Sequence, residues 1–359
     1  MFYVVQRPSY LCTMKSIDRR FLTAAGVTLV FLYLVILAGS VVRATGSGMG
    51  CPDWPRCFGY YIPPTDPSQL DFHSSQEYTK GMMIIQNDTL WRAKEKFTSG
   101  TTFTYEHWEK YPVHNYAKFV VAQTWTEYIN RLMGALSGLA SLILLFYAIR
   151  RRKTDGVSLL LVLVHLVVIG FVAWLGKVVV DSNLKPVTIT LHMLCALIMV
   201  FIMIIIRYRA KKLAGVFEKS AIGKRLQRLV VFALLFTLAQ IILGTQVRQQ
   251  VDELYKSTQD GSRDTWIAQL TSRYTVHFSM AMVLLAVNIF MWFALRRKNI
   301  LAEAKTLLNA SMLIVLGTYV AGVVMHNFGV PAFVQPVHLF LAMVLAGVQF
   351  ALMMRVKAF

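Results

Sequence analysis

Charged side chains are scarce in this 359-residue sequence. They make up 15% of the residues, whereas soluble domains carry about 25%, and this deficit argues against a soluble enzyme. Acidic residues are the scarcer sign, with 18 Asp and Glu against 37 Lys and Arg, so the net charge is +19. Hydrophobic residues make up 56%, which excludes a disordered chain. The composition predicts a membrane protein.

Long apolar runs recur along the chain, each close to the ~20 residues that a helix needs to cross a bilayer. The first run is too long for the core of a signal peptide, and no small-residue cleavage site follows it, so we expect a retained anchor. We predict an all-α integral membrane protein with eight transmembrane helices, at residues 21–42, 126–149, 157–180, 187–206, 229–247, 274–295, 306–326 and 335–354.

Basic residues are concentrated on one side of the predicted spans. They precede the first span, follow the second, lie between the fourth and fifth, and follow the sixth and the eighth. The short loops on the other side are nearly free of them, since 181–186 has only Lys185 and 327–334 has none. By the positive-inside rule both termini are cytoplasmic and loop 44–125 lies outside, in what we expect to be a bacterial inner membrane. Topology, and not nucleic-acid binding, accounts for the basic excess.

Residues 44–125 form a long polar segment, unlike the short loops elsewhere on the outer side. The segment is rich in Tyr, Trp, Lys and Glu. We expect it to hold short amphipathic helices that lie on the membrane surface.

The two halves of the sequence resemble each other. Three motifs recur: Gly39–Arg43 with Gly244–Arg248, Gly176–His192 with Gly322–His338, and Asn130 with His277. The last two recur at offsets of 146 and 147 residues. Each half has an even number of spans, so both halves point the same way. We predict two tandem four-helix bundles in parallel repeat, with a cytoplasmic tail 1–20, an N-terminal half 21–206, a basic linker 207–228 and a C-terminal half 229–359.

Histidines lie at similar depth near the outer ends of the even-numbered spans. His277 in the sixth span faces His338 in the eighth, and Asn130 in the second faces His192 in the fourth. Haem iron accepts axial nitrogen ligands from opposite faces of the porphyrin. The pair His277 and His338 therefore predicts bis-His haem ligation; the alternative is that each ring is a hydrogen-bonded interfacial residue.

Other polar residues of the spans have two interpretations. Arg43 and Arg248 stand at the outer ends of the first and fifth spans. Arginine pairs carboxylates bidentately, so these two are candidates for binding haem propionates; the alternative is snorkelling to the interface. Lys177 is expected to snorkel. His165 and His326 have no paired histidine, and we expect structural or interfacial roles for them.

The four cysteines fall into two groups. Cys51 and Cys57 lie in the outer loop, where an oxidising compartment favours a disulfide. Zinc is the rival, but two cysteines alone do not complete a tetrahedral site. Cys12 and Cys195 are expected to be reduced thiols.

Two motifs resemble those of the haem A synthase family, membrane proteins of cytochrome oxidase assembly. The first is VVRATGSGMGCPDWPRC at 41–57, which is similar to the family's opening motif and includes its cysteine pair. The second is EYINR at 127–131, which resembles Glu-x-x-His-Arg of its second span. The resemblance covers essentially all eight spans.

The resemblance implies a reaction, in which the C8 methyl of haem O is oxidised to the formyl group of haem A by successive hydroxylation. It implies a haem b cofactor between His277 and His338. It assigns His192, Asn130 and Arg131 to the substrate-haem site, and Glu127 as the catalytic carboxylate. The implied partners are haem O, the farnesyltransferase that makes it and oxidase assembly factors; a homo-oligomer and the electron acceptor stay open.

Asn130 departs from the pattern, because the family has His there. An amide is a poor iron ligand, so haem O would bind through His192 alone, with an open or water-filled position opposite. This departure keeps two other functions open: a membrane b-type cytochrome for electron transfer, and a non-catalytic haem carrier or assembly factor. Glu127 favours the enzyme, because a carboxylate at the membrane edge suits proton transfer; its alternative is a salt bridge to Arg131.

Overall fold

The computed structural model describes residues 16–112, 118–182, 186–257 and 265–358. Within these ranges, eight helices are long and apolar enough to cross a membrane, as the sequence predicts. They are α2 (Ser16–Ala44), α3 (Val121–Arg150), α4 (Gly156–Asp181), α5 (Pro186–Leu213), α6 (Lys224–Ser257), α8 (Ser272–Arg296), α9 (Ala302–Asn327) and α10 (Val334–Arg355), with the short α7 (Trp266–Gln269) before α8. The chain is a multi-pass membrane protein.

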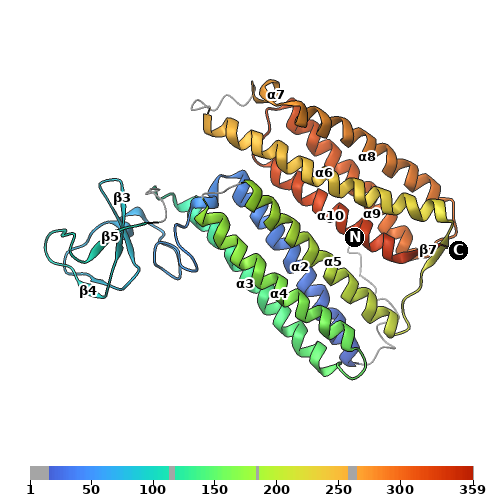
Figure 1. Cartoon of the computed structure of the whole chain (residues 1–359), viewed down its shortest axis with the longest axis horizontal. Helices are drawn as coiled ribbons and strands as arrows, with labels where there is room; N and C mark the ends of the chain where they lie inside the picture. Colours follow the sequence, from blue (N-terminus) through green and yellow to red (C-terminus); the bar gives the residue numbers. More distant parts are fainter. Residues whose placement is uncertain (1–15, 113–117, 183–185, 258–264, 359) are drawn as a thin grey trace, which may run out of the picture.

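The axes of the helices are roughly aligned, and the helices gather in two groups. Figure 1 shows α2, α3, α4 and α5 side by side, and α6, α8, α9 and α10 beside them. The groups meet where α2 and α5 pack on α10. Phe201 of α5 stacks on Phe350 of α10 with ring centroids 4.4 Å apart, and a Cβ atom at Gly347 would overlap the Tyr33 hydroxyl of α2. Gly347 therefore allows α10 to approach α2 closely.

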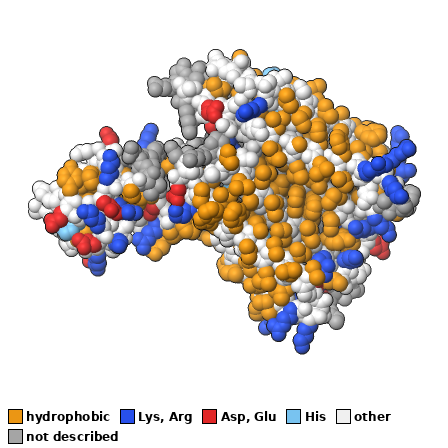
Figure 2. All heavy atoms as spheres, in the orientation of Figure 1, with side chains coloured by type: hydrophobic (Ala, Val, Ile, Leu, Met, Phe, Trp, Pro, Cys, Tyr) orange, Lys and Arg blue, Asp and Glu red, His pale blue; other side chains and the backbone are white. Residues whose placement is uncertain are grey.

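The outer faces of the helices are apolar. Figure 2 shows hydrophobic side chains over the helical part of one face, with Lys and Arg gathered at one end of it. Val167 and Leu313 are among the most exposed, at 73% and 72%. Large exposed apolar surfaces mark a contact with lipid or with another protein, and helices of membrane-spanning length favour lipid. We call the end with the basic residues the basic end and the opposite one the loop end.

Asp155 organises the basic end. Its Oδ1 accepts hydrogen bonds from Ser158 N at 3.0 Å, which caps α4, and from Arg209 Nη2 of α5 at 3.1 Å. Arg151, only 4% exposed, lies beside it and pairs with Asp18 of α2 at 2.7 Å. These bonds join α2, α4 and α5 where the chain turns between α3 and α4. Most of the basic stretch 207–228 is helical, since α5 runs to Leu213 and α6 begins at Lys224; strand β6 (Ser220–Ile222) between them pairs in parallel with β7 (Val356–Ala358).

The segment between α2 and α3 is built from strands, so the expected amphipathic helices are wrong for its described residues. Its elements are η1 (Ser47–Met49), η2 (Pro67–Leu70), β1 (Glu77–Tyr78), β2 (Met83–Gln86), β3 (Thr89–Ala93), β4 (Phe97–Thr98) and β5 (Trp108–Lys110). The antiparallel sheet has the order β2-β3-β5, and β1 pairs with β4. Figure 1 shows these strands projecting beyond the loop end of the helices.

Local turn chemistry explains the strands. Asn87 and Asp88 join β2 to β3 with φ angles of 51° and 53°, the left-handed pair that a two-residue hairpin turn requires and that Asn and Asp tolerate. Aromatic rings then form a small core, in which Tyr78 lies 4.9 Å from Trp108 between ring centroids. The segment therefore buries aromatic rings such as Tyr78 and Trp108 in a small core of its own.

Candidate functional site

His277 and His338 face each other near the loop end of α8 and α10. Their ring centroids are 6.4 Å apart and their planes are inclined by 72°. Two imidazoles that bind one metal ion from opposite sides, with metal–nitrogen bonds of about 2 Å, place their centroids about 6.5 Å apart. The observed spacing therefore fits one metal ion between the two rings.

The hydrogen bonds of the two rings also suit ligation. His338 Nδ1 lies 3.0 Å from Thr318 O, so Nδ1 carries the proton and Nε2 keeps its lone pair. A ligating histidine usually holds its second N–H in this way. His277 Nδ1 is buried without a hydrogen-bond partner among the described residues. Gln240 of α6 lies against the same residue and donates from Nε2 to His277 O at 2.6 Å.

The rest of a metal's coordination shell has to come from a ligand. The described residues contain no cluster of three or more His, Cys, Asp or Glu side chains able to hold a metal ion. Two opposed imidazoles suit an iron whose other four nitrogens belong to a porphyrin. The residues present therefore fit a haem better than a free metal ion.

A glycine on the neighbouring helix lies against each of these rings. A Cβ atom at Gly244 of α6 would lie 3.0 Å from His277 Cε1, and one at Gly322 of α9 would lie 3.4 Å from His338 Cε1. A larger residue at either position would press on the ring. The two glycines thus leave the space in which each imidazole lies.

The same arrangement occurs in the N-terminal half. A Cβ atom at Gly176 of α4 would lie 3.2 Å from His192 Cε1, and one at Gly39 of α2 would lie 3.6 Å from Asn130 Oδ1. Asn130 Oδ1 is buried and lacks a hydrogen-bond partner in the described part of the chain. Asn130 therefore lies against Gly39 much as His277 lies against Gly244, with an amide in place of an imidazole.

Arg43 and Arg248 lie together at the loop end, joined by an acidic residue. Asp252 Oδ2 pairs with Arg43 Nη2 at 3.0 Å, and its Oδ1 pairs with Arg248 Nη2 at 2.7 Å. Arg248 Nη2 also donates to Arg43 O at 3.1 Å. The sequence reasoning missed Asp252, although its position four residues after Arg248 on one helix was a usable signal. Asp252 therefore pairs with both guanidinium groups.

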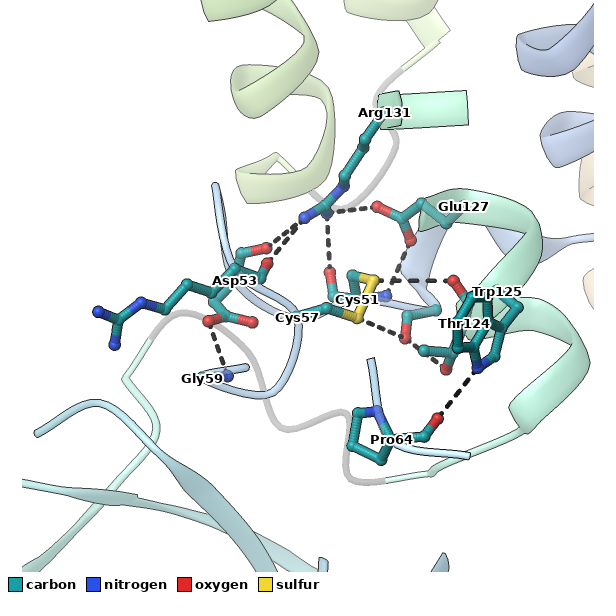
Figure 3. Close-up of a disulfide and its surroundings, with 11 residues drawn as sticks. Cys51, Asp53, Cys57, Gly59, Pro64, Thr124, Trp125, Glu127 and Arg131 are labelled. Atoms are coloured by element: carbon teal, nitrogen blue, oxygen red, sulfur yellow. Dashed lines mark hydrogen bonds and ion pairs between the residues drawn. A yellow bond between two sulfur atoms is a disulfide. The ribbon is translucent and has the colours of Figure 1, made fainter. Parts of the chain in front are cut away.

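Glu127 and Arg131 attach α3 to the loop that follows α2 (Figure 3). Glu127 is 4% exposed. Its Oε2 accepts from Cys51 N at 2.8 Å, and its Oε1 pairs with Arg131 Nη2 at 2.5 Å. Arg131 Nη1 donates to the carbonyls of Asp53 at 2.7 Å and Arg56 at 2.9 Å. The salt bridge considered from the sequence is thus present, and it continues into the loop.

The expected disulfide between Cys51 and Cys57 is confirmed. Thr124 Oγ1 of α3 donates to Gly50 O at 2.8 Å, directly before the disulfide. Asp53 lies inside the loop, where its Oδ2 accepts from Gly59 N at 3.0 Å. Burial raises the pKa of the Asp53 carboxyl, against the opposing hydrogen bond from Gly59 and the charge of Arg131. Cys195 is a buried free thiol, whereas Cys12, like Lys185, lies outside the described residues.

The remaining polar residues of the spans have local partners. Tyr274 Oη lies 2.5 Å from His326 Nδ1, which joins α8 to α9. Tyr274 stands 147 positions after Glu127, the same offset that relates His277 to Asn130. Tyr274 is therefore the equivalent of Glu127 in the repeat. Lys177 pairs with Asp181 of its own helix.

His165 lies in the interior of the N-terminal group, where its Nε2 is 3.0 Å from Ser141 Oγ of α3. The repeat offsets carry Ser141 to Asn288 and His165 to Ser311. Ser311 Oγ donates to Asn288 Oδ1 at 3.2 Å, and both residues are buried. Equivalent positions of the two halves therefore carry equivalent buried polar contacts between neighbouring helices.

The sequence model of the COX15-CtaA family, described as cytochrome oxidase assembly protein, matches residues 23–350. The chain belongs to this family. The match reaches into all eight spans and includes every residue of the site described above. The family resemblance inferred from the two motifs is confirmed.

Curated relatives within this family carry the name Heme A synthase. The Shewanella oneidensis protein is 25% identical over 218 residues, which cover 61% of this chain and 54% of that protein. The Flavobacterium psychrophilum protein is 22% identical over 340 residues, or 89% and 93% of the two chains. The Geobacillus kaustophilus protein is 36% identical over 75 residues, or 20% and 23%. The chain matches about half the length of several of these relatives, including that of Shewanella oneidensis.

Proposed function

We propose that this member of the cytochrome oxidase assembly family is a haem A synthase. It oxidises the C8 methyl group of haem O to the formyl group of haem A. The pair His277 and His338, whose rings are spaced for one iron and packed on glycines, carries the haem-binding part of the proposal. The buried Glu127 carboxylate, one helical turn from Asn130, carries the oxidation. The names of the curated relatives support it.

The C-terminal half, 229–359, holds the haem b cofactor in this proposal. His277 and His338 would hold its iron, and Thr318 O fixes the tautomer of His338. When bound, the haem supplies one-electron redox chemistry. Tyr274 and His326 form a separate contact between α8 and α9, one helical turn towards the loop end from His277 and Gly322.

The N-terminal half, 21–206, holds the substrate haem O. His192 is its iron ligand, and Asn130 leaves the opposite side of the iron without an imidazole. Glu127 lies one helical turn from Asn130 and would accept a proton that the methyl group releases, while the electrons of the oxidation pass to an external electron acceptor. Its bonds to Arg131 and Cys51 N hold the carboxylate in place, so the disulfide loop becomes part of the wall of the substrate site.

Arg43 and Arg248 bind haem propionates in this account. The structure shows that they already bind a carboxylate, that of Asp252. A propionate would take the place of Asp252 at one arginine while Asp252 stays paired with the other.

The two halves form a parallel repeat, with the loop end outside a bacterial inner membrane and both termini in the cytoplasm. The farnesyltransferase that makes haem O, oxidase assembly factors and a second copy of the chain are its proposed partners.

Haem analysis tests the proposed activity. Haem is extracted from cells that make haem O, with and without this chain, and identified by mass. Haem A that forms only when the chain is present supports the enzyme. The alternative is a b-type electron-transfer cytochrome, which the single pair of opposed imidazoles in the C-terminal half favours; it predicts bound haem b without haem A. A haem carrier predicts bound haem O that stays unchanged.

A further inference from the structure

An exposed apolar tip follows the disulfide loop. The tip consists of Tyr61 and Ile62, which are 73% and 68% exposed. The backbones of Cys57 and Tyr60 exchange two hydrogen bonds, at 2.9 and 3.1 Å, and so fix the turn from which the tip emerges. The next two residues, Pro63 and Pro64, are buried. The tip is therefore an apolar projection on a rigid support.

One hydrogen bond sets the level of this tip relative to the membrane. Trp125 lies in the second turn of α3, and its Nε1 donates to Pro64 O at 3.2 Å. Tryptophans at the ends of membrane spans lie at the level of the lipid headgroups. Further along α3, Ile129 and Leu132 are 47% and 43% exposed and belong to the apolar outer face. Trp125, Ile129 and Leu132 are spaced four and three positions apart and so lie on one face of α3. The hydrogen bond therefore places Pro64, two residues after the tip, beside the outer end of this face.

The residues around the tip match the chemistry of a lipid headgroup region. The Arg56 guanidinium lies 4.7 Å from the centre of the Tyr61 ring, and its Nη2 donates to Tyr61 Oη at 3.3 Å. A cation beside an aromatic ring suits the boundary between lipid phosphates and acyl chains, because one part prefers water and the other an apolar phase.

A charged residue, Asp66, follows the tip four positions after Ile62. Asp66 accepts hydrogen bonds from the Ser68 hydroxyl and the Ser68 N–H, which lower the pKa of its carboxyl. An ionised carboxylate is costly to move out of water. The chain therefore returns to water by Asp66, and the tip reaches only the headgroup region.

We propose that Tyr61 and Ile62 insert into the headgroup region of the membrane leaflet at the loop end. The tip thereby anchors the segment between α2 and α3 to the bilayer, next to Glu127, Arg131 and the disulfide. Lipid is the occupant that the structure favours, because the bond between Trp125 and Pro64 holds the base of the tip beside the lipid-facing side of α3. The inference does not depend on haem binding or on the proposed activity.

A depth measurement on the full-length protein tests the proposal. Cys12 and Cys195 are replaced by Ser, and a fluorophore is attached to Ile62→Cys or, as the control, to Tyr105→Cys. Tyr105 is also strongly exposed, at 62%, but it lies between β4 and β5, which Figure 1 shows far from the helices. The protein is placed in phosphatidylcholine vesicles that contain lipids spin-labelled near the headgroup or deep in the acyl chain.

The proposal predicts that the shallow spin label quenches the fluorophore at position 62, that the deep label quenches it less, and that neither quenches the fluorophore at position 105. Equal quenching at both positions, or none at position 62, overturns the proposal. Protection of position 62 from a water-soluble quencher without quenching by lipid also overturns it, and assigns the tip to a protein partner such as a second copy of the chain. Ile62→Cys and Tyr105→Cys are at exposed positions, and Cys195→Ser replaces a thiol by a hydroxyl of similar size, so the fold is expected to tolerate them.

Discussion

The glycine behind His277 offers a sharp test of how the ring is held. In Gly244→Ala, the new Cβ atom would lie 3.0 Å from His277 Cε1 and 3.7 Å from each ring nitrogen. Carbon atoms pack at about 3.5–4.0 Å, so the ring has to move about 0.5 Å or more away from α6. This movement of the His277 ring also shifts its two nitrogen atoms, one of which would bind the iron.

The expected cost follows from packing. Adding a methyl group to a filled site costs about 1–3 kcal/mol, and here the cost opposes the ring position that an iron between His277 and His338 requires. A loss of this size weakens binding by about 5–150-fold. Gly322→Ala should have a smaller effect, because its Cβ would lie 3.4 Å from His338 Cε1, close to ordinary contact.

Haem titration of the purified protein, followed by the low-spin absorbance bands, measures this loss. Gly134→Ala is the matched control, because a Cβ atom at Gly134 of α3 meets nothing within 4 Å. That substitution should leave haem affinity unchanged and stabilise the helix by about 0.5–1 kcal/mol. If Gly244→Ala binds haem as tightly as Gly134→Ala, the reasoning about the ring contact is refuted.

Three further predictions concern other parts of the chain. Asn130→His should raise the affinity of the N-terminal half for added haem and shift its spectrum towards low spin, because two imidazoles would then be available; an unchanged titration would contradict this. Glu127→Ala should cut haem A formation while the haem of the C-terminal half stays bound, and full haem A production would remove Glu127 from the mechanism. Asp155→Asn should lower the thermal unfolding temperature, because the Asp155 carboxylate caps α4 and binds Arg209. Burial of Asp155 opposes ionisation, but the hydrogen bonds from Ser158 and the charge of Arg209 outweigh it, so its pKa is lowered; the stabilisation is present at neutral pH and is lost as the pH falls below the ordinary value of about 3.9. A wild-type protein that loses no more stability in acid than Asp155→Asn would contradict that assignment.

Much of the membrane part could be predicted from the sequence, because its signals are local and periodic. Apolar runs give the eight spans, and the repeat of Gly and His at fixed offsets gives residues that the structure places in equivalent contacts. Gly39, for example, lies against Asn130 as Gly244 lies against His277. A fixed offset carries this information because equivalent helices place equivalent residues at the same depth.

The missed features depend on contacts between distant residues. Asp252 pairs with Arg248, four positions before it, and with Arg43, 209 positions before it. A sequence pattern indicates the contact with Arg248 but not the contact with Arg43. The strands between α2 and α3 were missed because a segment rich in Tyr and Trp suits either a membrane surface or a small aromatic core. The turn at Asn87 and Asp88 was the local signal for the second.

The most direct test of the central claim is the absorbance spectrum of the purified protein and of three single variants. The account predicts a low-spin b-type haem that is lost or converted to high spin in His277→Ala and in His338→Ala. His326→Ala is the control, because it removes a histidine of the same half that does not face the ligand pair, and it should keep the low-spin spectrum. An unchanged low-spin spectrum in both His277→Ala and His338→Ala would contradict the account.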